Sequence, residues 1–166
     1  MRVEALIALG GNLGDVWGTF AAARSEMAAL PNSESLASSL LYRSEAIGPA
    51  GQPDYLNAVL LVETSIPPLS LLEHLQAIET GHGRVRNETW GPRTLDLDLI
   101  DYGGLVLNTT ELTLPHPEMQ KRIFVLQPLC DIQPDWGHPQ LKMTAVQLLG
   151  TLKAEGIMPL GEGETW

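Results

Sequence analysis

The sequence predicts an α+β fold in which helices pack on a mostly antiparallel β-sheet. Four stretches rich in Val, Leu and Ile are typical of strands, namely residues 3–9, 36–42, 56–63 and 94–100. Residues 15–30 and 67–79 carry apolar side chains at helical spacing instead. The resulting order, strand–helix–strand–strand–helix–strand, is that of the ferredoxin-like βαββαβ core, with the helices expected on one face of the sheet.

Local signals support the individual elements. The first strand runs into Gly10-Gly11-Asn12, which is typical of a tight turn, and the first helix ends before Pro31. Pro67-Pro68 opens the second helix, because proline is tolerated in the first helical turn.

Accessory elements are expected after the fourth strand. We expect a hairpin turn at Gly103-Gly104, an apolar stretch over residues 123–132, a short helix over residues 144–152 and a loosely packed tail.

Length and composition limit the classes of protein. With 166 residues and no internal repeat or linker, the chain is expected to be a single domain, residues 1–166. A net charge of −10 disfavours nucleic-acid binding, and no apolar run approaches the roughly 20 residues that span a membrane. The start lacks the pattern of a signal peptide, and the single cysteine, Cys130, forms no internal disulfide. We therefore expect a cytoplasmic monomer.

Half of the basic residues lie in one part of this acidic chain. Five of the ten Lys and Arg residues are Arg84, Arg86, Arg93, Lys121 and Arg122. Such a local cationic patch suits a small anionic ligand, although chance clustering on a solvated surface is the competing interpretation.

Asp96-Leu97-Asp98 is the sharpest chemical signal. Side chains alternate along a strand, so the two aspartates share one face, roughly 6 to 7 Å apart at the backbone. Two such carboxylates repel each other unless a cation lies between them, and Mg²⁺ takes oxygen ligands that it shares with phosphates. A solvated polar strand face remains the alternative.

The loop directly before the aspartates favours phosphate chemistry. Arg84, Arg86 and Arg93 supply planar, permanently charged donors for phosphate oxygens, and the glycines between residues 81 and 91 would let the loop close. Trp90 could anchor that lid, stack on an aromatic ligand or simply pack. The chain lacks the Gly-x-x-x-x-Gly-Lys-Ser/Thr phosphate loop, which excludes an ordinary P-loop kinase.

Two further polar residues have open interpretations. His116 lies between two prolines and could contact phosphate or cap a loop. Asn57 stands at the start of a strand, where it could offer a donor and an acceptor to a heterocyclic amide or serve a structural role.

These motifs together resemble a known enzyme family. Two stretches closely resemble the signature of 6-hydroxymethyl-7,8-dihydropterin pyrophosphokinases: Arg84-Val85-Arg86 and Trp90-Gly91-Pro92-Arg93-Thr94-Leu95-Asp96-Leu97-Asp98. Four others are similar as well: residues 9–14, 52–57, 114–117 and 122–124. The resemblance spans residues 3 to 134.

The resemblance implies a reaction of folate biosynthesis. ATP would give its pyrophosphoryl group to hydroxymethyl-dihydropterin, leaving AMP, with two Mg²⁺ ions on Asp96 and Asp98. Catalytic roles would fall to both aspartates, Arg84 and Arg93. The implied ATP contacts are Glu79, Arg84, Arg86, Trp90, Arg93, Leu99, Thr113, His116 and Arg122. The implied pterin contacts are Gly10, Ser44, Ala46, Ile47, Tyr55, Asn57, Trp90, Asp96 and Phe124.

Some residues depart from the family pattern, and two rival functions remain. Glu111 stands where some members carry a basic residue near the nucleotide, and the loop between Arg86 and Trp90 is one residue shorter. A different Mg-dependent phosphotransferase or nuclease would leave Tyr55, Asn57 and Phe124 without a shared purpose. A silent binding module would not need all the carboxylates and arginines.

Overall fold

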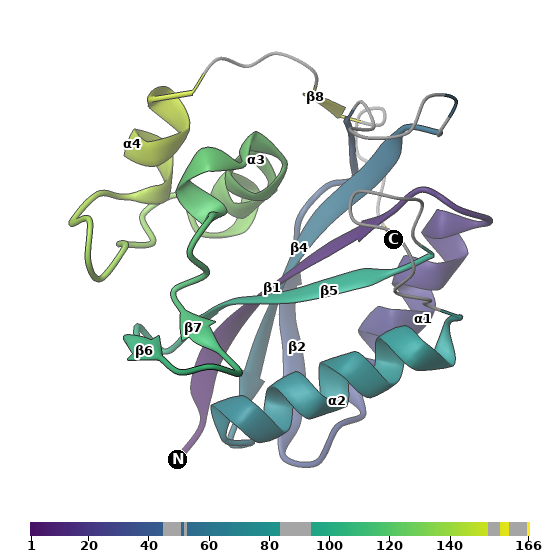
Figure 1. The fold of residues 1–166 in the computed structure, drawn as a ribbon, viewed down its shortest axis with the longest axis horizontal. Coiled ribbons are helices and arrows are strands. Elements are labelled where there is room, and N and C mark those ends of the chain that lie inside the picture. Colours follow the sequence, from purple (N-terminus) through teal and green to yellow (C-terminus); the bar gives the residue numbers. More distant parts are fainter. Residues whose placement is uncertain (45–50, 52, 84–93, 153–156, 160–165) are drawn as a thin grey trace.

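The computed structural model of the chain describes residues 1–44, 51, 53–83, 94–152, 157–159 and 166 (Figure 1). The core elements are β1 (Val3–Gly11), α1 (Val16–Ala28), β2 (Ser33–Ser38), β3 (Tyr42–Ser44), β4 (Tyr55–Thr64), α2 (Pro68–Gly81) and β5 (Asp96–Tyr102). The later elements are β6 (Leu107–Asn108), β7 (Thr113–Leu114), the 3₁₀ turn η1 (Met119–Lys121), α3 (Ile123–Ile132), α4 (Ala145–Gly150) and β8 (Ile157–Pro159).

The main sheet confirms the predicted fold class. Its strands follow the order β5-β1-β4-β3-β8, β2 also pairs with β4, and these pairings are all antiparallel. β1 and β4 form the long centre of the sheet, and β5 lies at one edge (Figure 1). The βαββαβ order with two central strands from its first and third positions is the ferredoxin-like arrangement.

The second predicted strand, residues 36–42, is wrong in its bounds. The chain forms two strands there, β2 and β3, which pair with successive parts of β4 and are separated by residues 39–41. Ser39 is buried, and its hydroxyl oxygen accepts the Val59 N–H at 2.9 Å. A serine side chain that takes over a backbone hydrogen bond interrupts the strand ladder at that point.

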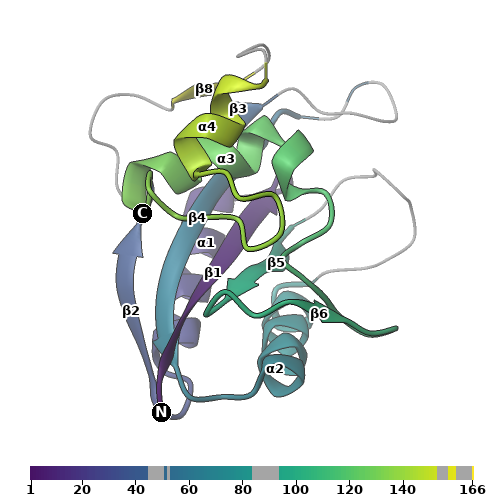
Figure 2. The same cartoon turned by 90° about the vertical axis from the view of Figure 1, so that its left-hand side faces the viewer.

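Helices cover both faces of the sheet rather than one. On the first face, Ile7 of β1 packs in one core cluster with Phe20 of α1 and Leu75 of α2. On the second face, Leu6 of β1 packs with residues of α3 and α4 in a separate cluster. α3 and α4 lie on the other side of the sheet from α1 and α2 (Figures 1 and 2). The run of apolar residues in β1 has no polar alternation, which is typical of a strand buried on both sides. The apolar stretch over residues 123–132 is the helix that covers the second face.

One accessory prediction is wrong, and the loose packing predicted for the tail does not hold at its last residue. Gly103 and Gly104 do form a turn with positive φ, but β6 pairs with β7 and not with β5. Trp166 is not loosely packed: it is 3% exposed, and its indole N–H donates to the Ser39 carbonyl at 2.9 Å. The helices in the described part of the chain are all too short or too polar to cross a membrane.

Candidate active site

Asp96 and Asp98 lie on β5 and face the side of the sheet that α3 covers. They pair with Gly10 and Ala8 of β1, and Ala8 belongs to the core cluster of that face. Leu97 between them is buried in the opposite cluster, against α1 and α2. The alternation predicted from the sequence is therefore present, and both aspartates are partly exposed, although Asp96 Oδ1 is itself buried.

Gly10 separates Asp96 from Asn57. Gly10 pairs with Asn57 of β4 on one side and with Asp96 of β5 on the other. A Cβ atom at Gly10 would lie 3.9 Å from Asn57 Oδ1 and 4.0 Å from the Asp96 Cβ. The glycine thus leaves an open strip of sheet surface between an amide and a carboxylate, two groups predicted to contact substrate.

Glu79 fixes the strand that carries the two aspartates. It is 2% exposed on α2, and its Oε2 accepts the Leu97 N–H at 2.7 Å. Because β5 is an edge strand, this N–H points away from β1, and a buried carboxylate on the neighbouring helix satisfies it. Glu79 was predicted near the nucleotide; in the structure it contacts the backbone between Asp96 and Asp98.

His116 and Arg122 lie close to Asp98. The backbone N–H of His116 donates to the Ile100 carbonyl at 2.9 Å, and this bond attaches the turn around Pro115 to β5. Its Nδ1 accepts the Glu118 N–H at 3.1 Å, so the ring does cap a loop, and Nε2 carries the proton when the ring is neutral. Arg122 approaches Asp98 Oδ2 at 3.9 Å.

The pKa of His116 is set by opposing effects. Burial lowers it below its ordinary value, the Asp98 charge raises it, and the Arg122 charge lowers it again. The ring is therefore neutral at physiological pH, and it would interact with a phosphate oxygen as a hydrogen-bond donor from Nε2.

A cavity of about 250 Å³ brings several predicted nucleotide residues together. Asp98, Leu99, Thr113 and His116 all line it, and so does Glu111, the acidic departure from the family pattern. Sequence reasoning missed six other lining residues: Leu72, Gln76, Leu97, Thr110, Leu112 and Pro117. Leu72 and Gln76 could have been found, because they lie one helical turn apart and Gln76 lies one turn before Glu79.

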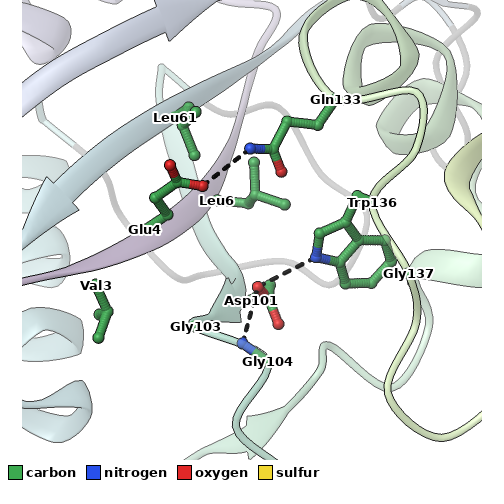
Figure 3. A pocket seen from close by; sticks show the side chains of 10 residues that line it. All are labelled: Val3, Glu4, Leu6, Leu61, Asp101, Gly103, Gly104, Gln133, Trp136 and Gly137. Atoms are coloured by element: carbon green, nitrogen blue, oxygen red, sulfur yellow. Dashed lines mark hydrogen bonds between the residues drawn. The ribbon is translucent and has the colours of Figure 1, made fainter.

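A larger cavity, of about 430 Å³, lies elsewhere on the second face (Figure 3). It contains Glu4, which accepts from Gln133, and Asp101, which accepts from Trp136 and Gly104. None of the predicted site residues lines it. The smaller cavity beside Asp98 is the better nucleotide candidate, because Leu99, Thr113 and His116, which were predicted near the nucleotide, line it.

The described residues predicted to contact the pterin lie on the face of the sheet that carries Asp96 and Asp98. Asn57 is 4% exposed, and its Nδ2 donates to Ser44 Oγ at 2.8 Å. Tyr55 precedes Asn57 by two positions on β4, so it is on the same face. Phe124, in the first turn of α3, packs against the second core cluster, and the Arg122 guanidinium lies 5.7 Å from its ring centroid.

Six predicted residues lie outside the described part of the chain. They are Ala46, Ile47, Arg84, Arg86, Trp90 and Arg93. Their predicted roles stay predictions.

The fold and this site define a class of protein: a ferredoxin-like α+β domain with a carboxylate-bearing strand beside a cavity at the edge of the sheet. Comparison with protein families makes the class specific. The model of the 7,8-dihydro-6-hydroxymethylpterin-pyrophosphokinase (HPPK) family matches residues 6–134, and the chain belongs to this family.

Individual relatives agree with this membership. The chain is 45% identical over 159 residues to a Synechocystis protein named 2-amino-4-hydroxy-6-hydroxymethyldihydropteridine pyrophosphokinase, covering 96% of this chain and 81% of the relative. A Pseudomonas aeruginosa protein of the same name is 44% identical over 151 residues, covering 91% and 93%.

A solved structure shows the same fold. The wild-type Plasmodium falciparum HPPK-DHPS crystal structure with pterin and p-hydroxybenzoate superimposes with a TM-score of 0.70 at 14% identity. The match covers 91% of this chain but 43% of that longer one.

Proposed function

We propose that this protein transfers the pyrophosphoryl group of ATP to the hydroxymethyl group of 6-hydroxymethyl-7,8-dihydropterin, giving AMP and the pterin diphosphate in folate biosynthesis. Its family membership supports this reaction. The observation that carries the proposal is the row Asn57–Gly10–Asp96 across three neighbouring strands. It puts an amide able to read a heterocycle next to a carboxylate able to hold a phosphate-bound metal.

Asp96 and Asp98 would hold magnesium, and the donor set fits this ion. Mg²⁺ in phosphotransferases typically takes one or two carboxylates and fills its remaining positions with phosphate oxygens and water. Asp96 and Asp98 provide two carboxylates on one strand face, which meets this requirement. We infer that two ions bind here. When bound, they would neutralise negative charge on the phosphates.

The residues around Asp98 would position the phosphates. Arg122, 3.9 Å from Asp98, can bridge from the carboxylate to a phosphate oxygen, and His116 can donate from Nε2. Thr113 and Leu99 line the adjoining cavity, where we place the rest of the nucleotide. Arg84, Arg86 and Arg93 would complete the charge neutralisation, with Arg84 and Arg93 acting on the transferred group.

The pterin would lie on the opposite side of Gly10 from Asp96, over β4. Asn57 would pair with its amide edge, held in orientation by Ser44. Tyr55 and Phe124 would contact the faces of the ring, a geometry that aromatic groups favour. Ala46, Ile47 and Trp90 are proposed to close this pocket.

The remaining inferences concern the state of the protein. We propose that residues 1–166 form one pyrophosphokinase domain, because helices from both halves of the chain pack on one sheet. We also propose that it acts as a monomer in the cytoplasm, without nucleic-acid or membrane partners.

The test is the identity of the nucleotide product. The protein is incubated with ATP, Mg²⁺ and hydroxymethyl-dihydropterin, and the nucleotides are separated by ion-exchange chromatography. AMP that accumulates in step with pterin consumption is expected. ADP as the product would mean an ordinary kinase and would overturn the proposal.

A further inference from the structure

A hydrogen-bonded pair, Tyr42 and Asp131, connects the two elements on either side of the proposed pterin site. The Tyr42 hydroxyl on β3 donates to the Asp131 carboxylate on α3 and lies 2.8 Å from both oxygens. Asp131 Oδ2 also accepts the Leu40 N–H at 3.2 Å. One carboxylate on α3 therefore holds both the start of β3 and the segment that precedes it.

On the strand side, the pair acts close to the residues that would read the pterin edge. Tyr42 is 5% exposed and pairs with Asn57 of β4. Ser44, two positions later on the same strand face, accepts from Asn57 Nδ2 at 2.8 Å. β3 is three residues long and pairs with β4 and β8, and the bond to Asp131 adds a contact with α3 that neither strand pairing supplies.

On the helix side, Asp131 lies on the same face of α3 as Phe124. Seven residues separate Phe124 from Asp131, almost two full turns of an α-helix, so the two side chains leave the same face of α3. Pro128 between them lacks the N–H that would bond the Phe124 carbonyl, which weakens the helix at the turn carrying Phe124. The orientation of that turn therefore depends on what holds α3 against the sheet.

We propose that Tyr42 and Asp131 are positioning residues for pterin binding. They fix the separation of β3 and α3, and so act through Ser44 and Asn57 on one wall and Phe124 on the other. This inference rests on the proposed function.

The bond persists over the pH range in which an enzyme works. Burial, followed by the hydrogen bond to Asp131 and its charge, raises the pKa of the Tyr42 hydroxyl well above its ordinary value. The hydroxyl therefore stays protonated and stays a donor at neutral and alkaline pH.

The experiment compares two tyrosines. Tyr42→Phe removes the hydroxyl that bonds Asp131. Tyr102→Phe is the matched control, because the Tyr102 hydroxyl also makes one short hydrogen bond, 2.6 Å to the Ile66 carbonyl, outside the proposed site. Asp131→Asn keeps an acceptor oxygen, whereas Asp131→Ala does not. Each variant is titrated with 6-hydroxymethylpterin and, separately, with MgATP, and kcat and KM are measured for AMP formation.

Tyr42→Phe and Asp131→Ala should raise the pterin Kd by roughly fivefold to tenfold, the loss of part of one charge-assisted hydrogen bond. Asp131→Asn should have a smaller effect, MgATP affinity should not change, and Tyr102→Phe should leave the pterin Kd as in the wild type. An unchanged pterin Kd in Tyr42→Phe would overturn the proposal. So would an equal loss in Tyr102→Phe, or equal losses for pterin and MgATP.

A second measurement separates this inference from the proposed function. A double-mutant cycle of Tyr42→Phe and Asp131→Ala in urea unfolding reports their coupling without any substrate. The two residues could show coupling while the wild-type protein binds pterin but forms no AMP. In that case the proposed reaction fails and the positioning role stands. Absence of coupling would contradict the positioning role directly.

Discussion

The buried hydrogen bond between Glu79 and the Leu97 N–H gives the most specific stability prediction. In the wild type, Glu79 Oε2 accepts the Leu97 N–H at 2.7 Å. Glu79→Ala removes this acceptor and leaves the buried Leu97 N–H without it. Hydrogen bonds to charged groups contribute about 1.5–3 kcal/mol, and we expect the free energy of unfolding to fall by at least that range. Glu79→Gln keeps an oxygen acceptor and should lose about 1 kcal/mol.

The same change should affect metal use more than pterin binding. Leu97 lies between Asp96 and Asp98, so loosening its backbone disturbs both carboxylates at once. Urea unfolding gives the stability, and initial rates over a range of Mg²⁺ concentrations give the apparent metal affinity. Glu73→Ala, an exposed position on the same helix, is the control and should change neither. Wild-type stability and wild-type Mg²⁺ dependence in Glu79→Ala would refute the reasoning.

Three further predictions concern other sites. Gly10→Ala should fold normally, since its Cβ would meet Asn57 Oδ1 at 3.9 Å in ordinary contact. It should weaken pterin binding in a fluorescence titration, and full affinity would show that the pterin does not use the sheet surface at Gly10. His138 has a lowered pKa through burial, and its Nδ1 accepts two backbone N–H groups. Its contribution to stability is therefore present above the ordinary histidine pKa and lost as pH falls below it, so His138→Gln should flatten the decline in melting temperature between pH 7 and lower pH. Asp101 has a raised pKa because it is buried, so its ionisation opposes folding once pH exceeds the ordinary aspartate pKa. Asp101→Asn, which can still accept from Trp136, should raise the melting temperature at pH 7 and change it less in acid; a lower melting temperature at pH 7 would contradict this.

The order of the core elements could be predicted from the sequence because each element has its own periodicity. The coverage of the second sheet face could not. Residues 123–132 contain Pro128, so the stretch lacks a clean helical signal, and its helix is stabilised by contacts with β1 and β4 far away in the chain. The break at Ser39 similarly depends on Val59, and the burial of Trp166 depends on Phe20, 5.8 Å away between ring centroids.

The candidate site, too, could be predicted from the sequence only in part. The shared face of Asp96 and Asp98 follows from strand alternation alone, and the structure has it. The contact of Glu79 with Leu97 requires α2 to pack beside the edge strand β5, which no local pattern states. The Tyr42–Asp131 pair joins residues 89 positions apart and had no sequence signal.

The central claim, that Asp96 and Asp98 hold the metal for pyrophosphoryl transfer, is tested most directly by Asp98→Asn. The substitution keeps the shape of the side chain and removes the charge. We expect AMP formation to fall by about 100-fold or more at saturating ATP, while the pterin Kd and the melting temperature stay near wild-type values. An Asp98→Asn protein that forms AMP at the wild-type rate, with the same Mg²⁺ dependence, would contradict the assignment.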